Sequence, residues 1–359
     1  GVEGYTYSQY ARSGFNELIT VACCSLVMIL GLSTITRRET NWQKRVYSGL
    51  ENFIASGVEE YRGKKIALVT NHSGVDFNLR KNSDLLRCKG LEIVLACAPE
   101  HGLYGYENDY DSMLYQADLR LNVVVYNLHH LSIEQLRHLF RLADAVIFDI
   151  QDMGMRCYTY VSSLKQVMDA LNGTSIELVV LDRPNPLGFL GIDGAYLHDG
   201  YQSRHVSAFP STFIYNMTMG EAARFYRAGY ARDVHLTVVP LKNYRRDLLY
   251  NETMLPWVPP SPNLPTYESA VVYSSIVMIE GVNLSVGRGT TKPFEYIGAP
   301  WMEPRELAKL LPKIIESIRR DEVLFLVNAV YFKSDWQTPF DKSETRKEIF
   351  HAPGGDVET

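Results

Sequence analysis

Hydrophobic and polar residues follow a regular pattern between about residue 64 and residue 186. Short apolar runs with the length of strands occur at 64–71, 91–100, 120–128, 144–152 and 177–186. Segments with the 3.6-residue spacing of helices lie between several of them. Continuous Val, Ile and Leu runs are typical of parallel strands that are covered on both faces. The pattern therefore predicts an α/β protein with a doubly wound parallel sheet.

The helical segments carry recognisable end signals. Helices are predicted at 132–142, 162–172, 218–229 and 303–320. The first begins with a capping box, because Gln135 stands three residues after Ser132. After Pro186 the regular pattern is lost, although a further strand is predicted at 235–241. The Pro-rich segment 257–266 predicts an extended loop.

Polar residues follow most of the predicted strands at the point where each strand ends. They are Asn71, His72, Glu100, His101, Asp149, Gln151, Asp152, Asp182, Arg183 and Asn185. In an open parallel sheet the carboxyl ends of the strands meet at one edge, and ligands bind in the crevice outside it. The sequence therefore predicts a polar cleft rich in carboxylates and amides.

Charge and motif content exclude several classes of function. The formal net charge is −5, and no Lys- and Arg-rich run indicates a nucleic-acid-binding surface. The first strand lacks the glycine pattern of a dinucleotide site, and neither a phosphate-binding loop nor a nucleophile elbow is present. No His or Cys spacing indicates a metal site, and no cofactor is expected. Carboxylates, amides and an Arg suit glycoside hydrolysis.

Seven motifs at these positions resemble the exo-β-N-acetylmuramidase family, in the family's order, over about residues 46–301. They are TNHSGVD (70–76), PEHGLYG (99–105), FDIQDMGMRCYTY (148–160), LDRPNPLG (181–188), PPSPNLPT (259–266), EGVNLSVGRGTT (280–291) and PFEYIGAPW (293–301). The resemblance implies release of N-acetylmuramic acid from the non-reducing end of peptidoglycan fragments. It also implies a Rossmann-like domain, a smaller C-terminal subdomain and a cleft between them. The expected partners are muropeptides or disaccharides that contain N-acetylmuramic acid.

The resemblance implies three catalytic candidates. Glu100 is the expected general acid, since partial burial at a strand end would favour its protonated form; the alternative is a carboxylate that caps the next helix. Asp149 and Asp152 lie three residues apart, so on a strand they would point to opposite faces and only one would enter the cleft. The substrate's 2-acetamido group can serve as an internal nucleophile, which would require only an acid and a carboxylate that positions the amide.

The remaining site candidates are expected to bind the sugar. Its lactyl carboxylate needs a cation, and Arg is suited to bidentate carboxylate binding. The Arg candidates are Arg156, Arg183 and Arg288, of which Arg183 could instead brace the turn that follows it. The other candidate ligands are Asn71, His72, His101, Gln151, Tyr158, Asn185, Asn263 and Asn283.

The pattern divides the chain into four parts. Residues 1–45 form a leader or unrelated segment whose apolar run, 18–32, is too short for a stable membrane span and suits a signal-peptide core. Export to the periplasm or beyond is therefore expected, with a cytoplasmic location as the alternative. Residues 46–190 form the Rossmann-like domain, and 191–318 a smaller, truncated second subdomain. Residues 319–359 contain a serpin-like β segment at 324–359, without a reactive-centre loop.

Two departures from the family pattern support alternative functions. Val286 stands where the family usually has an acidic residue, and Tyr215 stands in place of the usual His before Met-Thr. A catalytically inactive, muropeptide-binding remnant is one alternative, because of Val286 and the truncated second subdomain. A serpin-related interaction protein is the other, because of the segment at 324–359.

Overall fold

The computed structural model describes residues 44–107, 114–202, 205–303, 305, 349–352 and 355–358. Three sequence-based predictions lie outside the described residues. They are the apolar run at 18–32, most of the helix at 303–320 and the larger part of the serpin-like segment.

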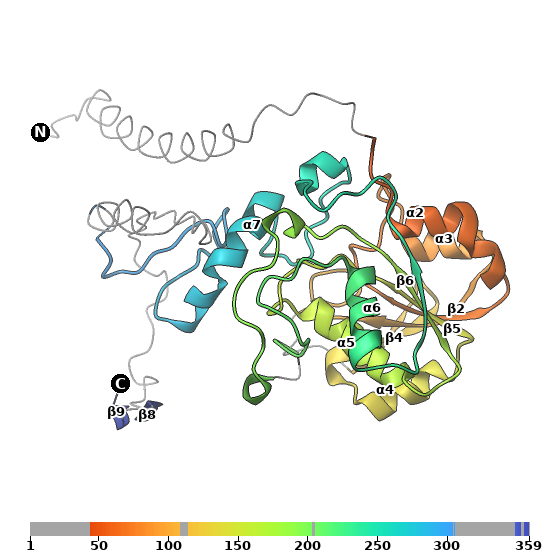
Figure 1. Cartoon of the computed structure of the whole chain (residues 1–359), viewed down its shortest axis with the longest axis horizontal. Helices are drawn as coiled ribbons and strands as arrows, with labels where there is room; N and C mark the ends of the chain where they lie inside the picture. Colours follow the sequence, from red (N-terminus) through yellow and green to blue (C-terminus); the bar gives the residue numbers. More distant parts are fainter. Residues whose placement is uncertain are drawn as a thin grey trace, which may run out of the picture.

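A seven-stranded sheet forms the centre of the protein (Figure 1). Its strands are β1 (Lys65–Thr70), β2 (Glu92–Ala98), β3 (Tyr115–Asp118), β4 (Val123–Asn127), β5 (Ala145–Asp149), β6 (Glu177–Leu181) and β7 (His235–Val239). Their spatial order is β3-β4-β2-β1-β5-β6-β7, and every pair except β3 with β4 is parallel. Without β3, this is the strand order of the Rossmann fold. The predicted Rossmann-like doubly wound sheet is confirmed.

Apolar side chains bury the central strands on both faces. In β5 all five residues are buried, and in β1 only Lys65 is exposed. Burial on both faces explains why these strands appear in the sequence as unbroken apolar runs. The register pairs Thr70 with Asp149, so β1 and β5 end at the same level.

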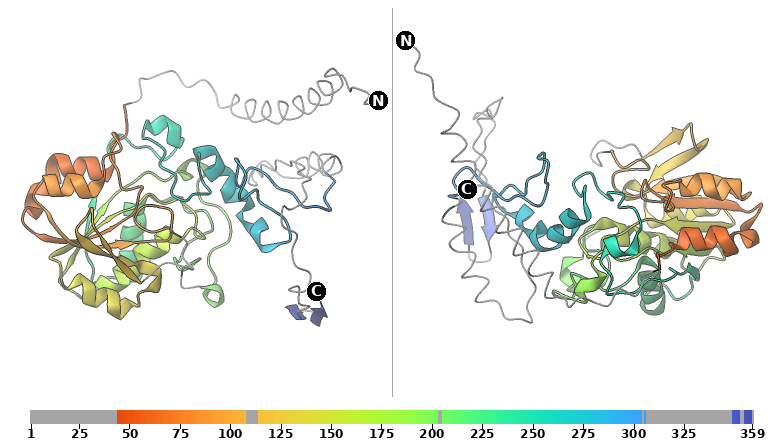
Figure 2. Two further views of the ribbon diagram at one scale, coloured as in Figure 1. Left: turned by 180° about the vertical axis from the view of Figure 1, so that it is seen from behind. Right: turned by 90° about the horizontal axis from the view of Figure 1, so that it is seen from above.

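Helices cover the two faces of the sheet, as Figures 1 and 2 show. On one face lie α2 (Gly49–Asn52) and α3 (Asn82–Cys88), where Leu50 and Leu86 pack with Ile66 and Leu68 of β1. On the other lie α4 (Ile133–Phe140), α5 (Thr159–Leu171) and α6 (Met219–Gly229). This second cluster includes Val69 and side chains from all three helices. Turns of other helical type are η1 (Phe53–Gly57), η2 (Val58–Tyr61), η3 (Leu128–His130), η4 (Gly188–Leu190), η5 (Asp199–Tyr201), η6 (Tyr250–Thr253) and η7 (Val277–Gly281).

The helix starts follow the expected capping chemistry with one difference. The capping box of Ser132 and Gln135 is formed at α4, as predicted, and Thr218 with Glu221 forms another at α6. By contrast, α5 begins at Thr159, three residues before the predicted start. Tyr158 is therefore the N-cap residue of α5.

Helix α7 (Tyr267–Ile276) lies beyond the carboxyl edge of the sheet (Figures 1 and 2). It follows the Pro-rich loop, and its Tyr273 contributes to the same apolar cluster as α5. Within the predicted serpin-like segment, β8 (Ile349–Ala352) and β9 (Gly355–Glu358) pair in antiparallel orientation.

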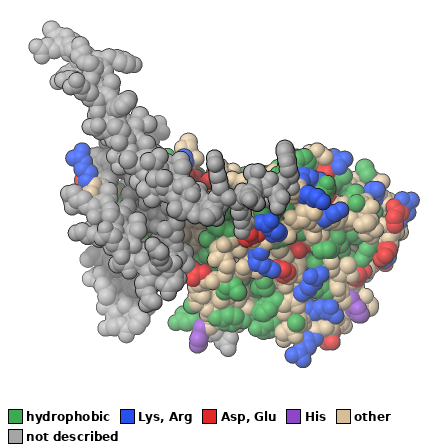
Figure 3. All heavy atoms as spheres, turned by 45° about the horizontal axis from the view of Figure 1, so that its top comes forward, with side chains coloured by type: hydrophobic (Ala, Val, Ile, Leu, Met, Phe, Trp, Pro, Cys, Tyr) green, Lys and Arg blue, Asp and Glu red, His purple; other side chains and the backbone are tan. Residues whose placement is uncertain are grey.

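On the described surface seen in Figure 3, basic and acidic side chains are interspersed rather than gathered by sign. Among the described residues, none of the helices is both long enough and apolar enough to cross a membrane.

Candidate active site

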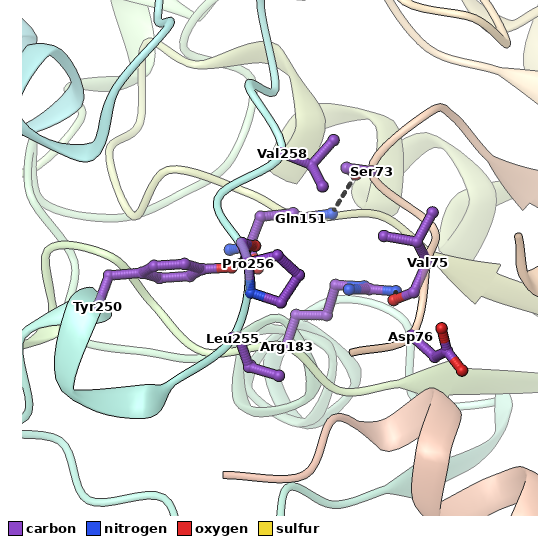
Figure 4. A pocket seen from close by; sticks show the side chains of 9 residues that line it. All are labelled: Ser73, Val75, Asp76, Gln151, Arg183, Tyr250, Leu255, Pro256 and Val258. Carbon is purple, nitrogen blue, oxygen red and sulfur yellow. Dashed lines mark hydrogen bonds between the residues drawn. The ribbon is translucent and has the colours of Figure 1, made fainter. Parts of the chain in front are cut away.

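The loops that follow β1 and β5 leave the sheet side by side, at the point where the strand order reverses. They are tied together by the Ser73 hydroxyl, which accepts a hydrogen bond from the backbone N–H of Gln151 at 2.9 Å (Figure 4). The same hydroxyl donates to Oδ1 of Asn71 at 2.6 Å. Both loops are buried. Such a reversal point is where open α/β sheets bind their ligands.

Asp149 is a buried carboxylate whose hydrogen bonds are directed into the protein. Arg183 donates to it from Nε at 2.6 Å and from Nη2 at 3.1 Å, and Asn82 Nδ2 donates at 2.7 Å. Arg183 also donates to the carbonyl of Val75 at 3.0 Å. Burial acts to lower the pKa of Arg183, but the charge and hydrogen bonds of Asp149 raise it. The pair therefore braces the ends of β1, β5 and β6, and a catalytic role for Asp149 stays a prediction.

Asp152 is also buried, but only one of its oxygens is bonded. Oδ2 accepts hydrogen bonds from the Gly154 N–H at 2.7 Å and from the Tyr215 hydroxyl. Oδ1 has no hydrogen-bond partner among the described residues. Burial raises the pKa of Asp152 to about 6, although these hydrogen bonds act in the opposite direction. A buried carboxyl whose pKa is raised towards neutrality is a candidate functional group.

Glu100 is half-buried in the loop after β2 and is held by the first turn of α5. Its Oε2 accepts a hydrogen bond from the Thr159 hydroxyl at 2.6 Å, and its backbone carbonyl accepts one from Tyr160 at 3.3 Å. The next residue, His101, has φ of 70°, which is unfavourable for a side chain with a Cβ. The hydrogen bonds from Thr159 and Tyr160 thus fix the direction of the Glu100 carboxylate.

Tyr158 is buried and is the N-cap residue of α5. Its ring packs edge-on against Tyr160, with 4.8 Å between ring centroids, and against Tyr273 at 6.3 Å. Burial, the two neighbouring tyrosines, and then the charges of Glu100 and Asp152 raise the pKa of its phenol well above 10. Its hydroxyl has no hydrogen-bond partner among the described residues. Tyr158 therefore offers a buried, protonated hydroxyl as a hydrogen-bond donor.

The Pro-rich loop closes the site from the other side. The carbonyl of Pro259 lies 2.5 Å from Nε2 of His72, and the carbonyl of Pro260 accepts a hydrogen bond from Tyr160 at 2.6 Å. Burial lowers the pKa of His72, so the ring is neutral around pH 7. A Cβ at Gly105, where φ is 82°, would lie 2.4 Å from Nδ1 of His72. Only glycine allows the loop at 99–105 to approach this ring so closely.

Six buried side-chain atoms without a hydrogen-bond partner in the described structure belong to residues that the sequence predicts for the site. They are Asn71 Nδ2, His72 Nδ1, Gln151 Oε1, Asp152 Oδ1, Arg156 Nε and the Tyr158 hydroxyl. A buried polar atom left unpaired costs about 1–3 kcal/mol. Such a concentration indicates groups that are arranged for a ligand.

A narrow pocket adjoins these residues, and Figure 4 shows the side chains that line it. They are Ser73, Val75, Asp76, Gln151, Arg183, Tyr250, Leu255, Pro256 and Val258. The pocket thus lies between the loops that follow the strands and the segment leading into the Pro-rich loop. Within the described part of the chain, no cluster of His, Cys, Asp and Glu is arranged to hold a metal ion.

Two predicted ligands are engaged in holding loops. Both Nδ2 hydrogen bonds of Asn185 go to backbone carbonyls, at Tyr215 and Met217, and its Oδ1 accepts from Leu187. Nη1 of Arg156 donates to the carbonyls of residues 195 and 211, both at 2.8 Å. Their roles as sugar ligands stay predictions.

The loop at 280–291 lies at the surface. Arg288 is exposed and forms an ion pair with Glu280 at 2.6 Å. Asn283 is exposed, and Asn263 is half-buried in the Pro-rich loop. Val286 is buried in the same apolar cluster as α5 and α7. Arg288 is thus paired at the surface, whereas Val286 lies in the apolar cluster that also contains Tyr158.

Some residues of the site escape sequence reasoning. Thr159 orients Glu100, Asn82 bonds Asp149, and Tyr215 bonds Asp152. None stands at a strand end, which was the signal used to find the others. Thr159 directly follows the predicted site residue Tyr158, but the helix was predicted to begin only at 162, so its role was not recognised.

Comparison with known proteins supports the motif series. The family model described as exo-beta-N-acetylmuramidase NamZ, N-terminal, matches residues 66–268, and the C-terminal model of the same name matches 271–347. The peptidoglycan beta-N-acetylmuramidase NamZ of Bacillus subtilis (strain 168) is 36% identical over 277 residues, which are 77% of this chain and 67% of that protein. A crystal structure of a DUF1343 family protein from Bacteroides fragilis NCTC 9343 superposes with a TM-score of 0.69. It has 32% identity and covers 76% of this chain and 70% of its own.

A second, short similarity concerns serpins. An uncharacterized serpin-like protein of Thermococcus kodakarensis is 35% identical over 77 residues, which are 19% of this chain and 18% of that protein. A further family model, for a domain of unknown function, matches residues 2–52.

Proposed function

The chain belongs to the exo-beta-N-acetylmuramidase NamZ family, and from this premise we propose that it is a glycosidase that releases N-acetylmuramic acid from the non-reducing end of peptidoglycan fragments. The observation that carries the proposal is a pair of carboxyls held by hydrogen bonds, Glu100 by Thr159 and Asp152 by Gly154, together with the Tyr158 hydroxyl and Oδ1 of Asp152, which lack partners in the described structure. Two acidic side chains with different surroundings are what glycoside hydrolysis requires.

We assign Glu100 as the general acid. The Thr159 hydroxyl holds one oxygen, so the other is the oxygen that delivers a proton to the glycosidic bond. Asp152 is assigned to the acetamido group, whose N–H would donate to its unpaired Oδ1. Tyr158 and Asn71 supply donors for other sugar oxygens. Asp149 supports the site through Arg183 and does not touch the substrate in this proposal.

Arg156 is the proposed ligand for the lactyl carboxylate. Of the three candidate arginines, Arg183 is paired with Asp149 and Arg288 with Glu280. Arg156 has no carboxylate partner among the described residues, and its Nε is unpaired there. It is therefore the guanidinium whose charge is available to an anionic ligand.

A matched pair of variants tests the proposal. Wild-type protein and the variants Glu100→Gln and Glu92→Gln are incubated with a disaccharide that carries N-acetylmuramic acid at its non-reducing end. Release of the free sugar is followed by mass spectrometry. Glu92 is exposed at the opposite end of the same strand, so its variant should keep wild-type activity. Glu100→Gln should lose about 10²- to 10⁴-fold.

Two results would contradict this assignment. Binding of the disaccharide without turnover by the wild type would identify a muropeptide-binding remnant instead of an enzyme. Full activity of the Glu100→Gln protein would remove Glu100 as the acid.

We also propose that the chain is exported. Peptidoglycan lies outside the cytoplasmic membrane, and the run at 18–32 has the length of a signal-peptide core. Fractionation of cells that produce the full chain tests this, and recovery of all the protein in the cytoplasm would refute it.

A further inference from the structure

One departure from the family pattern lies in direct contact with a proposed site residue. Tyr215, which stands in place of the usual His before Met-Thr, is only 3% exposed. Its hydroxyl donates a hydrogen bond to Oδ2 of Asp152. The proposed function uses the other oxygen of this carboxyl, Oδ1, and leaves Tyr215 without a role. The exchange of His for Tyr therefore changes the group that faces one side of the Asp152 carboxyl.

The backbone of Tyr215 is fixed on both sides. Its N–H donates to the carbonyl of Gly154 at 3.1 Å, and its carbonyl accepts a hydrogen bond from Nδ2 of Asn185 at 2.8 Å. Its ring packs against Phe209, with 6.1 Å between the ring centroids. These contacts hold the Tyr215 hydroxyl in place beside Asp152.

The protein occupies only one oxygen of the Asp152 carboxyl. Oδ2 accepts hydrogen bonds from the Gly154 N–H at 2.7 Å and from the Tyr215 hydroxyl, whereas Oδ1 has no partner among the described residues. A proton on Oδ2 would point at two donor hydrogens and would displace one of these bonds. When the carboxyl is protonated, the proton therefore lies on Oδ1, which is the oxygen assigned to the acetamido N–H.

Three titratable side chains interact with the Asp152 carboxyl, and all three are neutral at pH 7. They are Cys157 and Tyr158, which lead into α5, and Tyr215, which lies before α6. Burial raises the pKa of the Cys157 thiol to about 12. Burial, and then the charge of Asp152, raise the pKa of the Tyr215 phenol well above 10. Tyr215 is thus a neutral donor near pH 7, whereas a His at this position could take up a proton and become cationic.

We propose that Tyr215 is a positioning residue of the site: with Gly154 it occupies Oδ2 of Asp152, so that Oδ1 alone meets the substrate and Oδ1 alone takes up a proton. The proposal rests on the proposed function, since it concerns the carboxyl assigned to the acetamido group. A protonated Oδ1 no longer accepts the acetamido N–H. The side chain at position 215 therefore sets the pH range in which the substrate is held.

Two exchanges of residue 215 should move this pH range in opposite directions. The measurement is kcat/KM between pH 4 and pH 9 on the 4-nitrophenyl glycoside of N-acetylmuramic acid. In the wild type the activity should fall on the acid side near pH 6, because burial raises the pKa of Asp152 to about 6. Tyr215→Phe removes a hydrogen bond to the carboxylate, so the fall should move up by about one pH unit. Tyr215→His supplies a donor that can be cationic, so the fall should move down by about one pH unit.

Tyr226→Phe is the matched control. The Tyr226 hydroxyl also donates to a carboxylate, that of Asp169 at 2.8 Å, and its ring also packs against Phe209. The pH profile of this variant should coincide with that of the wild type.

A second readout does not depend on activity. The pKa of Asp152 is measured by ¹³C NMR of protein labelled at the Asp carboxyls, with Asp152→Asn to identify the signal. This pKa should be lowest in Tyr215→His, intermediate in the wild type and highest in Tyr215→Phe. It should be unchanged in Tyr226→Phe.

The two readouts separate this proposal from the proposed function. If the glycoside is cleaved but neither the acid-side fall nor the pKa of Asp152 changes with residue 215, the positioning role is refuted and the glycosidase stands. If no protein cleaves the glycoside while the pKa follows the expected order, Tyr215 positions the carboxyl and the glycosidase fails. An equal loss of activity at every pH in Tyr215→Phe, with an unchanged pKa of Asp152, would reduce Tyr215 to a packing residue and overturn the proposal.

Discussion

We expect the burial of the Asp152 carboxyl to lower the stability of the folded protein, because the group is kept for function. Burial raises its pKa from the ordinary value of 3.8 to about 6. Between these two values the folded protein binds a proton more readily than the unfolded chain. Below pH 3.8 the carboxyl is protonated in both states, so the cost of ionising it in the folded protein is absent. It grows as the pH rises towards 6 and is constant at higher pH.

The size of this cost follows from the displacement of the pKa. A change from 3.8 to about 6 corresponds to about 3 kcal/mol at pH 7. Asp152→Asn removes the charge and keeps an acceptor for Gly154 and Tyr215. Its free energy of unfolding at pH 7 should exceed that of the wild type by about 1–3 kcal/mol, since an unpaired amide N–H offsets part of the gain. Burial also raises the pKa of Asp182 to about 6, but its contribution cancels in the difference.

Urea titrations at pH 4, 5, 6 and 7, followed by intrinsic fluorescence, measure this difference. The stability gap between Asp152→Asn and the wild type should open between pH 4 and pH 6 and then stay constant. The exposed Asp233 gives a matched control, and Asp233→Asn should show no such gap. A gap of equal size at pH 4 and pH 7 would refute the reasoning from burial.

Three further variants test the supporting contacts. Arg183→Leu leaves the buried Asp149 charge without its ion-pair partner and with only the Asn82 side chain bonded to it, so urea titration should show a loss of about 3–5 kcal/mol. The double variant with Asp149→Leu should recover most of this loss, and an unaffected single variant would contradict the bracing role. Tyr160→Phe removes a hydrogen bond to Pro260 and should raise KM more than it lowers kcat; an unchanged KM would separate the Pro-rich loop from substrate binding. Thr159→Val releases the proposed acid and should lower kcat about tenfold. Thr159→Ser should restore most of that activity, and failure to do so would argue against positioning by the hydroxyl.

The sheet was predictable because burial on both faces leaves a strong local signal. The central parts of the predicted strand runs, such as 66–69 and 145–148, are apolar throughout, and each lies within an observed strand. The edge strand β3 has three exposed residues out of four, so it carries no apolar run and was missed. The short helix α3 was missed because Lys81, at its N-cap, makes no capping hydrogen bond that a sequence pattern could indicate.

The site was predictable only where residues follow strands at the same edge. Asn71, Gln151 and Asp152 were found for that reason, and each has a buried polar atom without a partner in the described structure. The bonds of Tyr160 to Pro260 and of His72 to Pro259 join positions 100 and 187 residues apart. Contacts at such separations depend on how the loops pack and leave no local pattern in the sequence.

The most direct test of Glu100 as the acid of a glycosidase compares two leaving groups. Nitrophenolate leaves with little help from a proton, whereas a sugar alkoxide requires one. We measure kcat/KM of wild type and Glu100→Gln on the 4-nitrophenyl glycoside of N-acetylmuramic acid and on the corresponding disaccharide. The variant should lose about 10²-fold or more on the disaccharide and far less on the nitrophenyl glycoside. Equal losses on the two substrates, or no loss on either, would contradict the assignment.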